Sequence, residues 1–84
     1  MKRAMFIKRV KIGAGDALLY KLSDPINETT NVVISAVSSS IGGERATIFP
    51  STDKGVITSF KSLAEAKNTL DHEAPLVNLG YEVM

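Results

Sequence analysis

The stretch Val32-Val-Ile-Ser-Ala-Val-Ser38 decides the fold. It is rich in β-branched residues and almost continuously apolar, as expected for a central strand that is buried on much of both faces. Ile34 lies near its middle. We therefore expect residues 32–37 to be the hidden centre of a sheet, against which the rest of the chain packs.

Two further strands are predicted on the N-terminal side of this stretch. Residues 4–12 alternate imperfectly, with Phe6, Val10 and Ile12 on one parity, which suits a strand with one inward face. Residues 17–22 read as a second strand.

The segments between these strands carry turn signals. Gly13-Ala-Gly-Asp16 permits positive φ and predicts a hairpin turn. The polar segment 23–31 contains Pro25 and predicts a loop.

The chain beyond the central stretch continues the sheet. Residues 39–44 predict a flexible loop and residues 45–49 a fourth strand that stops at Pro50. After a turn over 51–55, residues 56–58 are a candidate fifth strand. Connections this short favour antiparallel pairing, because parallel neighbours need crossovers of a dozen or more residues.

The C-terminal third changes to a helical pattern. Ser62-Leu-Ala-Glu65 is a capping-box sequence and predicts a helix over 62–70. A second helix is expected over 72–79, with Asp71 as its cap, Pro75 in its first turn and Gly80 at its C-terminal end. Extended chain follows at 81–83. The predicted fold is a single small α+β domain over 1–84: an antiparallel meander of four or five strands, with one or two C-terminal helices on one face.

Length and composition limit the chemistry. A domain of 84 residues hides about 60% of its unfolded surface, enough for one thin core. Apolar residues make up 44% of the chain and charged residues 23%, which is typical of a globular domain. Without cysteine there is no disulfide, thiolate metal site or cysteine nucleophile, and His72 is the only histidine. We therefore expect no enzyme activity, no metal and no cofactor.

The charge is unevenly distributed. Residues 1–15 carry five basic residues and no acid, whereas residues 16–84 carry five basic and nine acidic residues, so +5 and −4 sum to the net +1. A basic N-terminal strand can guide the protein toward nucleic acid or an acidic partner. The alternative interpretation is a solvated strand face, whose lysines prevent the sheet edge from pairing with another molecule. The candidate binding residues are Lys2, Arg3, Lys8, Arg9 and Lys11.

No membrane segment is predicted, because no stretch approaches about 18 uninterrupted apolar residues. The start Met1-Lys-Arg3 resembles the beginning of a signal peptide, but Lys8 and the basic residues after it interrupt the apolar stretch. A soluble, cytoplasmic protein is expected.

Three other motifs are candidates for a catalytic or binding site. His72 between Asp71 and Glu73 could act as a base or metal ligand, but neighbours in sequence do not share one helix face, so a capped helix start is the favoured interpretation. Gly13–Asp16 lacks the third glycine and following helix of a phosphate-binding loop. The segment 38–43 offers hydroxyls without a basic partner and is interpreted as a loop.

The aromatic residues have two interpretations. They could stack single-stranded bases beside the basic strand, or they could fill the thin core, with the tyrosine hydroxyls reaching water. Core packing is the favoured interpretation. The five residues are Phe6, Tyr20, Phe49, Phe60 and Tyr81.

Three blocks of sequence carry a resemblance: residues 20–26 (YKLSDPI), residues 32–37 with 46–50 (VVISAV and ATIFP), and residues 70–73 with 79–83 (LDHE and LGYEV). The chain resembles small uncharacterised proteins of bacteriophages and their actinobacterial hosts, over about residues 20–83. It departs from their pattern near 59–69, where a tryptophan and a glycine-rich loop are replaced by Phe60 and a helix-favouring Ala64-Glu-Ala-Lys67.

The resemblance implies no activity and suggests a phage-encoded protein that binds a host component. The expected function is a non-enzymatic small binding protein for a host protein or for a second copy of itself, as a homodimer. The alternative is nucleic-acid binding through the basic N-terminal strand.

Overall fold

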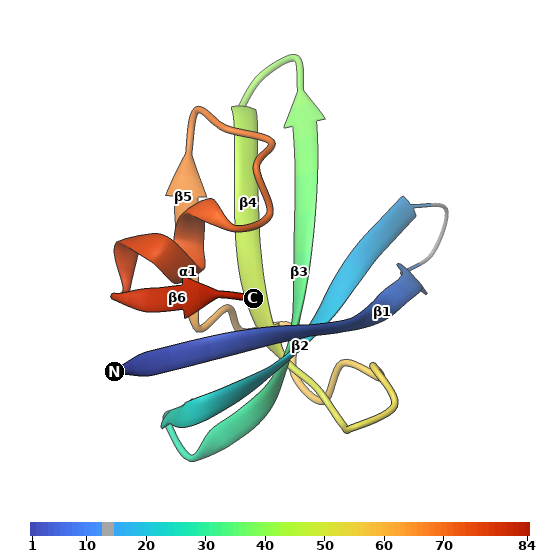
Figure 1. Cartoon of the computed structure of the whole chain (residues 1–84). Coiled ribbons are helices and arrows are strands. Elements are labelled where there is room, and N and C mark those ends of the chain that lie inside the picture. Colours follow the sequence, from blue (N-terminus) through green and yellow to red (C-terminus); the bar gives the residue numbers. More distant parts are fainter. Residues whose placement is uncertain (13–14) are drawn as a thin grey trace.

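The computed structural model describes residues 1–12 and 15–84 and is mostly β (Figure 1). Its strands occur in the sheet order β5-β4-β3-β2-β1-β6. A single short helix, α1, precedes the last strand in the described chain. The elements are β1 (Lys2–Ile12), β2 (Gly15–Ile26), β3 (Thr29–Ser39), β4 (Gly43–Pro50), β5 (Ala64–Lys67), α1 (Ala74–Asn78) and β6 (Tyr81–Val83).

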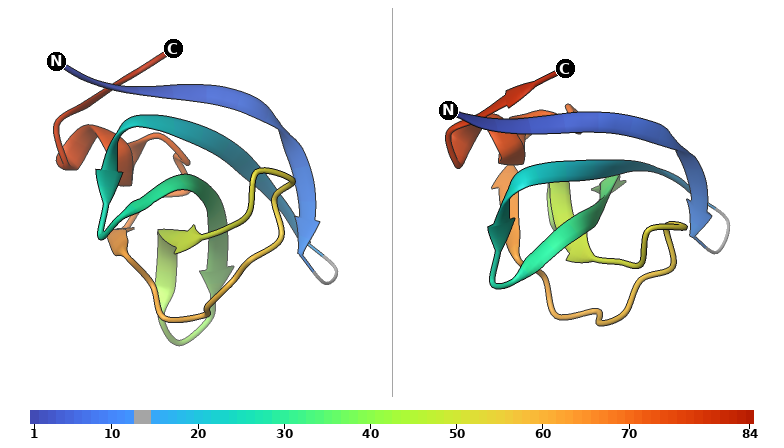
Figure 2. Two further views of the ribbon diagram at one scale, coloured as in Figure 1. Left: turned by 90° about the horizontal axis from the view of Figure 1, so that it is seen from below. Right: turned by 60° about the horizontal axis from the view of Figure 1, so that its bottom comes forward.

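The predicted α+β meander of four or five antiparallel strands is wrong. Strands β1 to β5 do pair antiparallel in succession, but β6 joins the free side of β1 in parallel, with Lys2 opposite Tyr81 and Ala4 opposite Val83. The result is a six-stranded mixed sheet that curls into a half-barrel (Figure 2). Parallel pairing is possible here because β5 and β6 lie at opposite edges, and the chain with α1 crosses between them.

The predicted helix over 62–70 is also wrong, because this segment contains β5. Ala66 lies opposite Ala46 of β4, and the Asn68 N–H donates to the Glu44 carbonyl at 2.7 Å. Alanine, glutamate and lysine favour a helix in isolation. The unpaired edge of β4 offers this segment backbone partners, and the period-two pair Ala64 and Ala66 packs toward the core. Tertiary context therefore overrides local preference.

The second predicted helix exists but is shorter, as α1. Pro75 lies at its start and Gly80 adopts φ +88° just beyond its end, so both of these predictions are confirmed. Asp71 is not its cap: Glu73 occupies that position without a side-chain bond, and the Asp71 carboxylate accepts the Glu73 N–H at 2.9 Å.

Two other connections differ from expectation. The predicted loop over 23–31 is the continuation of β2 into a tight hairpin, in which Asn27 and Glu28 both have positive φ. The candidate strand 56–58 is reduced to one bridge, between Ile57 and Ser51.

The hairpin predicted at Gly13–Asp16 is described only in part. Its residues 13–14 lie outside the described residues, while Ile12 pairs with Gly15 on either side of them.

Each face of the sheet is covered over part of its area. On one, the helix face, α1 contributes Leu76 to the buried cluster that also contains Tyr20, Val32 and Ile34. On the other, the loop face, the segment 51–60 covers Leu19 and Val33 through Ile57. Val32, Val33 and Ile34 are 0% exposed, which confirms double-sided burial for the first half of the predicted centre, whereas Val37 is 50% exposed.

Candidate functional site

A β-bulge in β1 determines where the basic side chains point. Phe6 pairs with Tyr20 and Lys8 with Leu19, so Ile7 between them has no partner in β2. Directly paired residues lie on the same face of a sheet. Because Tyr20 belongs to the helix-face core and Leu19 to the loop-face core, the bulge reverses the alternation of β1. Phe6 and Val10 therefore lie on opposite faces, although they share a parity in the sequence.

The five predicted binding residues are consequently divided between the two faces. Arg3 and Lys8 lie on the loop face, and Lys2, Arg9 and Lys11 on the helix face. The structure does not gather them into one patch.

On the helix face, two of these cations have partners. The Lys2 ammonium lies 4.7 Å from the centre of the Tyr81 ring. Arg9 is within 3.8 Å of the Asp16 carboxylate, in an exposed pair that contributes little to stability.

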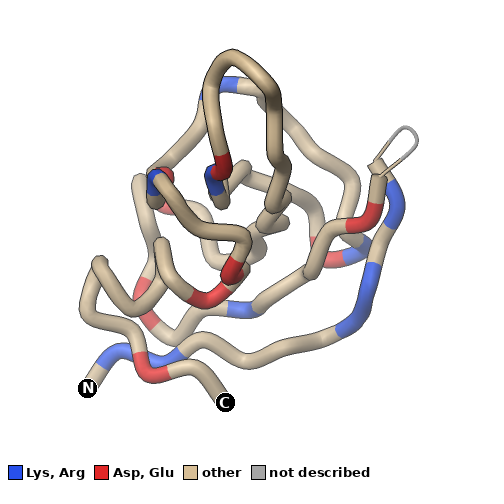
Figure 3. Tube along the Cα trace, turned by 90° about the horizontal axis from the view of Figure 1, so that it is seen from above, with Lys and Arg blue, Asp and Glu red and all other residues tan. Residues whose placement is uncertain are grey.

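The pairing registers assign the charged strand residues to faces and reveal an asymmetry of charge. Asp24 has no partner in these registers and is placed on the helix face by its position beside Tyr81. The loop face has five cations and two acids, a net +3, whereas the helix face has three of each, a net 0. Figure 3 shows these charges along the trace. The loop-face residues are Arg3, Lys8, Lys21, Arg45, Lys67, Glu65 and Glu82; those of the helix face are Lys2, Arg9, Lys11, Asp16, Asp24 and Glu44.

The segments that cover the two faces increase the difference in net charge between them. The loop over 51–61 adds Lys54, Lys61 and Asp53 to the loop face, a further net +1. The turn before α1 adds the acids Asp71 and Glu73 on the other side, where both raise the pKa of Tyr20, although burial of the ring is the larger cause. The strongly basic surface is therefore the loop face rather than β1 as a whole.

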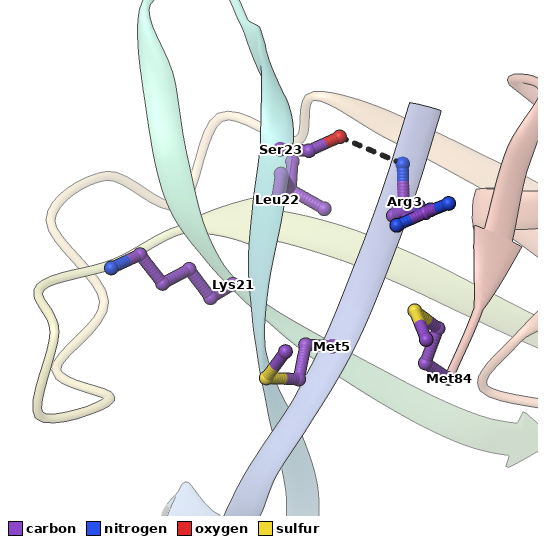
Figure 4. Close-up of a pocket in the computed structure, with 6 residues that line it drawn as sticks. All are labelled: Arg3, Met5, Lys21, Leu22, Ser23 and Met84. Carbon is purple, nitrogen blue, oxygen red and sulfur yellow. Dashed lines mark hydrogen bonds between the residues drawn. The ribbon is translucent and has the colours of Figure 1, made fainter. Parts of the chain in front are cut away.

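One hollow in this surface lies at the N-terminal end of β1. Its volume is about 290 Å³, and Met5 and Met84, 54% and 60% exposed, contribute to its wall beside Leu22. Figure 4 shows the Lys21 head group extending away from the pocket, and the Arg3 backbone N–H donating to Ser23 Oγ at 2.8 Å. We call these residues the methionine pocket: Arg3, Met5, Lys21, Leu22, Ser23 and Met84.

A second hollow, of about 270 Å³, lies at the opposite end of β1. Phe60 forms part of its wall and is 75% exposed, and its ring packs edge-to-face on Phe49 with 5.9 Å between centroids. Phe49 pairs with Val33 and so supports this ring from the loop face. We call this the Phe60 pocket: Lys11, Ile12, Gly55, Val56, Ile57 and Phe60.

The prediction that aromatic residues fill the core holds only for some of them. Tyr20 and Tyr81 are buried, and the Tyr81 hydroxyl donates to the Asp24 carbonyl rather than to water. Phe6 is 45% exposed and makes an edge-to-face contact with Tyr20, with 5.7 Å between centroids.

His72 does not form a reactive centre with its neighbours. Burial lowers its pKa, the nearby Arg9 lowers it further, and Asp71 opposes both effects. Asp71 already accepts the Glu73 N–H, and its own N–H donates to Thr69 Oγ1 at 3.0 Å, so its carboxylate serves the local turn. Among residues 1–12 and 15–84, no cluster of three potential metal-ligating side chains occurs.

The serine-rich turn is likewise structural. Ser39 Oγ accepts the Gly42 N–H at 2.7 Å and closes the connection from β3 to β4. Ile41 at its tip is 99% exposed.

Within the described parts of the chain, no helix has the length and apolar character needed to cross a bilayer. Comparison of the chain with protein-family models, curated proteins and solved structures gave no match. What the surface can bind is therefore inferred from its own geometry and charge.

The sequence prediction missed several members of these sites. Lys21 and Met84 were not predicted, and only the fold brings these residues beside β1. Phe60 was considered as a base-stacking residue, but core packing was the favoured interpretation, and the structure places it at 75% exposure. The sequence did contain one signal for the methionine pocket. Met5 and Met84 are apolar residues outside the predicted core, and apolar residues that gather on the surface are candidates for a binding site.

Proposed function

We propose that the protein is a non-enzymatic binding module that contacts a protein partner through the methionine pocket. The observation that carries this proposal is the pairing of two half-exposed methionines around an apolar hollow, with Arg3 at its rim. Methionine side chains adapt to the shape of an inserted side chain and are common at protein-binding surfaces. A partner that inserts one apolar side chain and presents a carboxylate to Arg3 fits this chemistry.

The resemblance to phage proteins is the reason to consider a host protein as this partner. A second copy of the chain is the other protein occupant considered. The binding rather than catalytic role is supported by His72, whose neighbouring carboxylate is engaged in a turn.

Three immobilised forms of the protein test this proposal against nuclease-treated host lysate: the parent chain, Met5→Glu and Ile41→Glu. Ile41 is a matched control, because it is exposed and lies on the turn between β3 and β4. We expect the parent and Ile41→Glu to retain the same protein and Met5→Glu to lose it. Binding of that purified protein should weaken about 30-fold or more in Met5→Glu, the effect of losing a central contact.

Light scattering of the three forms tests whether the protein associates with itself. A dimer of the parent that becomes monomeric only in Met5→Glu identifies a second copy as the partner. If Met5→Glu retains the same partners at unchanged affinity, the pocket is not the binding surface.

A further inference from the structure

The loop face has a second feature that the proposed function does not use. The Phe60 pocket lies at the far end of β1 from the methionine pocket. Arg3 and Lys11 are eight steps apart along β1, at most roughly 26 Å at about 3.3 Å per step, and the two hollows share no lining residue, so they are separate. We propose that the Phe60 end of the loop face binds single-stranded nucleic acid, with a base stacked on Phe60 and the phosphates along the neighbouring cations.

The first argument is the exposed ring. Phe60 is 75% exposed and makes an edge-to-face contact with Phe49, so much of its apolar ring is open to solvent. Every base has a face that can stack on such a ring, whatever the sequence. Lys11 also lines this hollow, but its register with Asp16 places its side chain on the helix face, so it is not counted among the cations that would meet the phosphates.

The second argument is the charge around the ring. Lys8 lies on the same face as Val10, the side chain that packs directly against Gly55. Lys54 adjoins that glycine in the chain, and Lys61 adjoins Phe60. The strand residues of this face carry net +3 and those of the opposite face net 0. A polyanion is therefore attracted more strongly to the loop face than to the helix face.

The third argument concerns the form of the nucleic acid. Readers of duplex DNA commonly insert a helix into the major groove. The helix that the structure describes, α1, has five residues and packs on the helix face. An exposed ring on the loop that packs over the strands suits unpaired bases instead. This inference is independent of the methionine pocket.

Fluorescence anisotropy with a labelled oligothymidylate of about 12 nucleotides tests the proposal, since this length is within the site size of single-domain binders. Phe60→Leu keeps an apolar side chain and removes the ring; affinity should fall by about fivefold to more than a hundredfold. Because Phe60 is largely exposed, circular dichroism should show an unchanged fold.

Lys8→Gln and Arg9→Gln form a matched pair. The two residues are adjacent in β1 and the net charge changes equally, but the bulge places them on opposite faces. Each phosphate contact contributes about 0.7 to the slope of log affinity against log salt for a single strand. We expect Lys8→Gln to reduce this slope by about that amount and Arg9→Gln to leave it unchanged.

Three results would overturn the inference. The first is no saturable binding of the oligonucleotide at low salt, and the second is an equal loss for Lys8→Gln and Arg9→Gln. The third is unchanged affinity in Phe60→Leu together with equally strong binding of polyglutamate, which would identify a general site for acidic chains, such as an acidic protein.

Discussion

Truncation of Ile34 examines the burial of the helix-face side of β3 directly. Ile34 is 0% exposed and lies opposite Leu18 and Ile48 on the two neighbouring strands. Replacement by alanine removes three buried carbons, about 2.4 kcal/mol at 0.8 kcal/mol each. The residual cavity adds to this cost, so the expected destabilisation is about 3 kcal/mol and within the range of about 2–5 kcal/mol for such changes.

Val37 on the same strand is the control. It is 50% exposed, and its truncation to alanine removes two carbons that are half in water, which costs about 0.8 kcal/mol or less. Urea unfolding followed by circular dichroism measures both variants. With a slope near 1 kcal/mol/M, the midpoint should fall by about 3 M for Ile34→Ala and by less than about 1 M for Val37→Ala. Equal shifts at unchanged slope would refute the proposed burial of β3.

The remaining predictions concern two glycines and the histidine. Gly55 and Gly80 both have φ +88°, but an added Cβ would lie 2.6 Å from Val10 Cγ1 at Gly55 and no closer than 3.5 Å to any atom at Gly80. Gly80→Ala should therefore cost about 1–2 kcal/mol of unfolding free energy and Gly55→Ala clearly more; the reverse order in thermal melts would contradict the packing of the loop on β1. Because burial lowers the pKa of His72 in the folded state, the unfolded chain binds the proton more readily, and stability should fall as the pH drops through about 6.5. His72→Gln should lose less stability than the parent between about pH 7.5 and pH 5.5, and identical losses would exclude this effect.

The parts of the fold that sequence reasoning predicted are those with a strong local signal. The continuous β-branched run at 32–34 is buried on both faces, and Pro75 and Gly80 mark the ends of α1. Each of these features follows from the residue itself. Proline fits the first turn of a helix, and glycine tolerates the left-handed conformation beyond its end.

The sequence predictions failed where pairing with a distant strand, rather than local sequence, determines the structure. Residues 64–67 have good helix formers, yet the open edge of β4 made them a strand. Tyr81–Val83 read correctly as extended chain, but no feature of three residues predicts that they pair in parallel with β1.

The candidate site was only half predictable for the same reason. The basic residues of β1 were identified, but not their division between faces, because an unpaired Ile7 leaves no mark in the sequence. The asymmetry of charge also depends on Lys21 and Arg45, whose face follows from their registers with β1 and β3.

The central structural claim is that the C-terminal strand closes onto β1 in parallel and makes a six-stranded curled sheet. Nuclear Overhauser contacts between backbone protons of the two strands measure this most directly. The structure predicts cross-strand contacts from Arg3 to Glu82 and from Ala4 to Val83, with slow hydrogen exchange at the Met84 N–H, which donates to the Ala4 carbonyl at 2.8 Å. Absence of these contacts, together with helical contacts across residues 62–70, would contradict it.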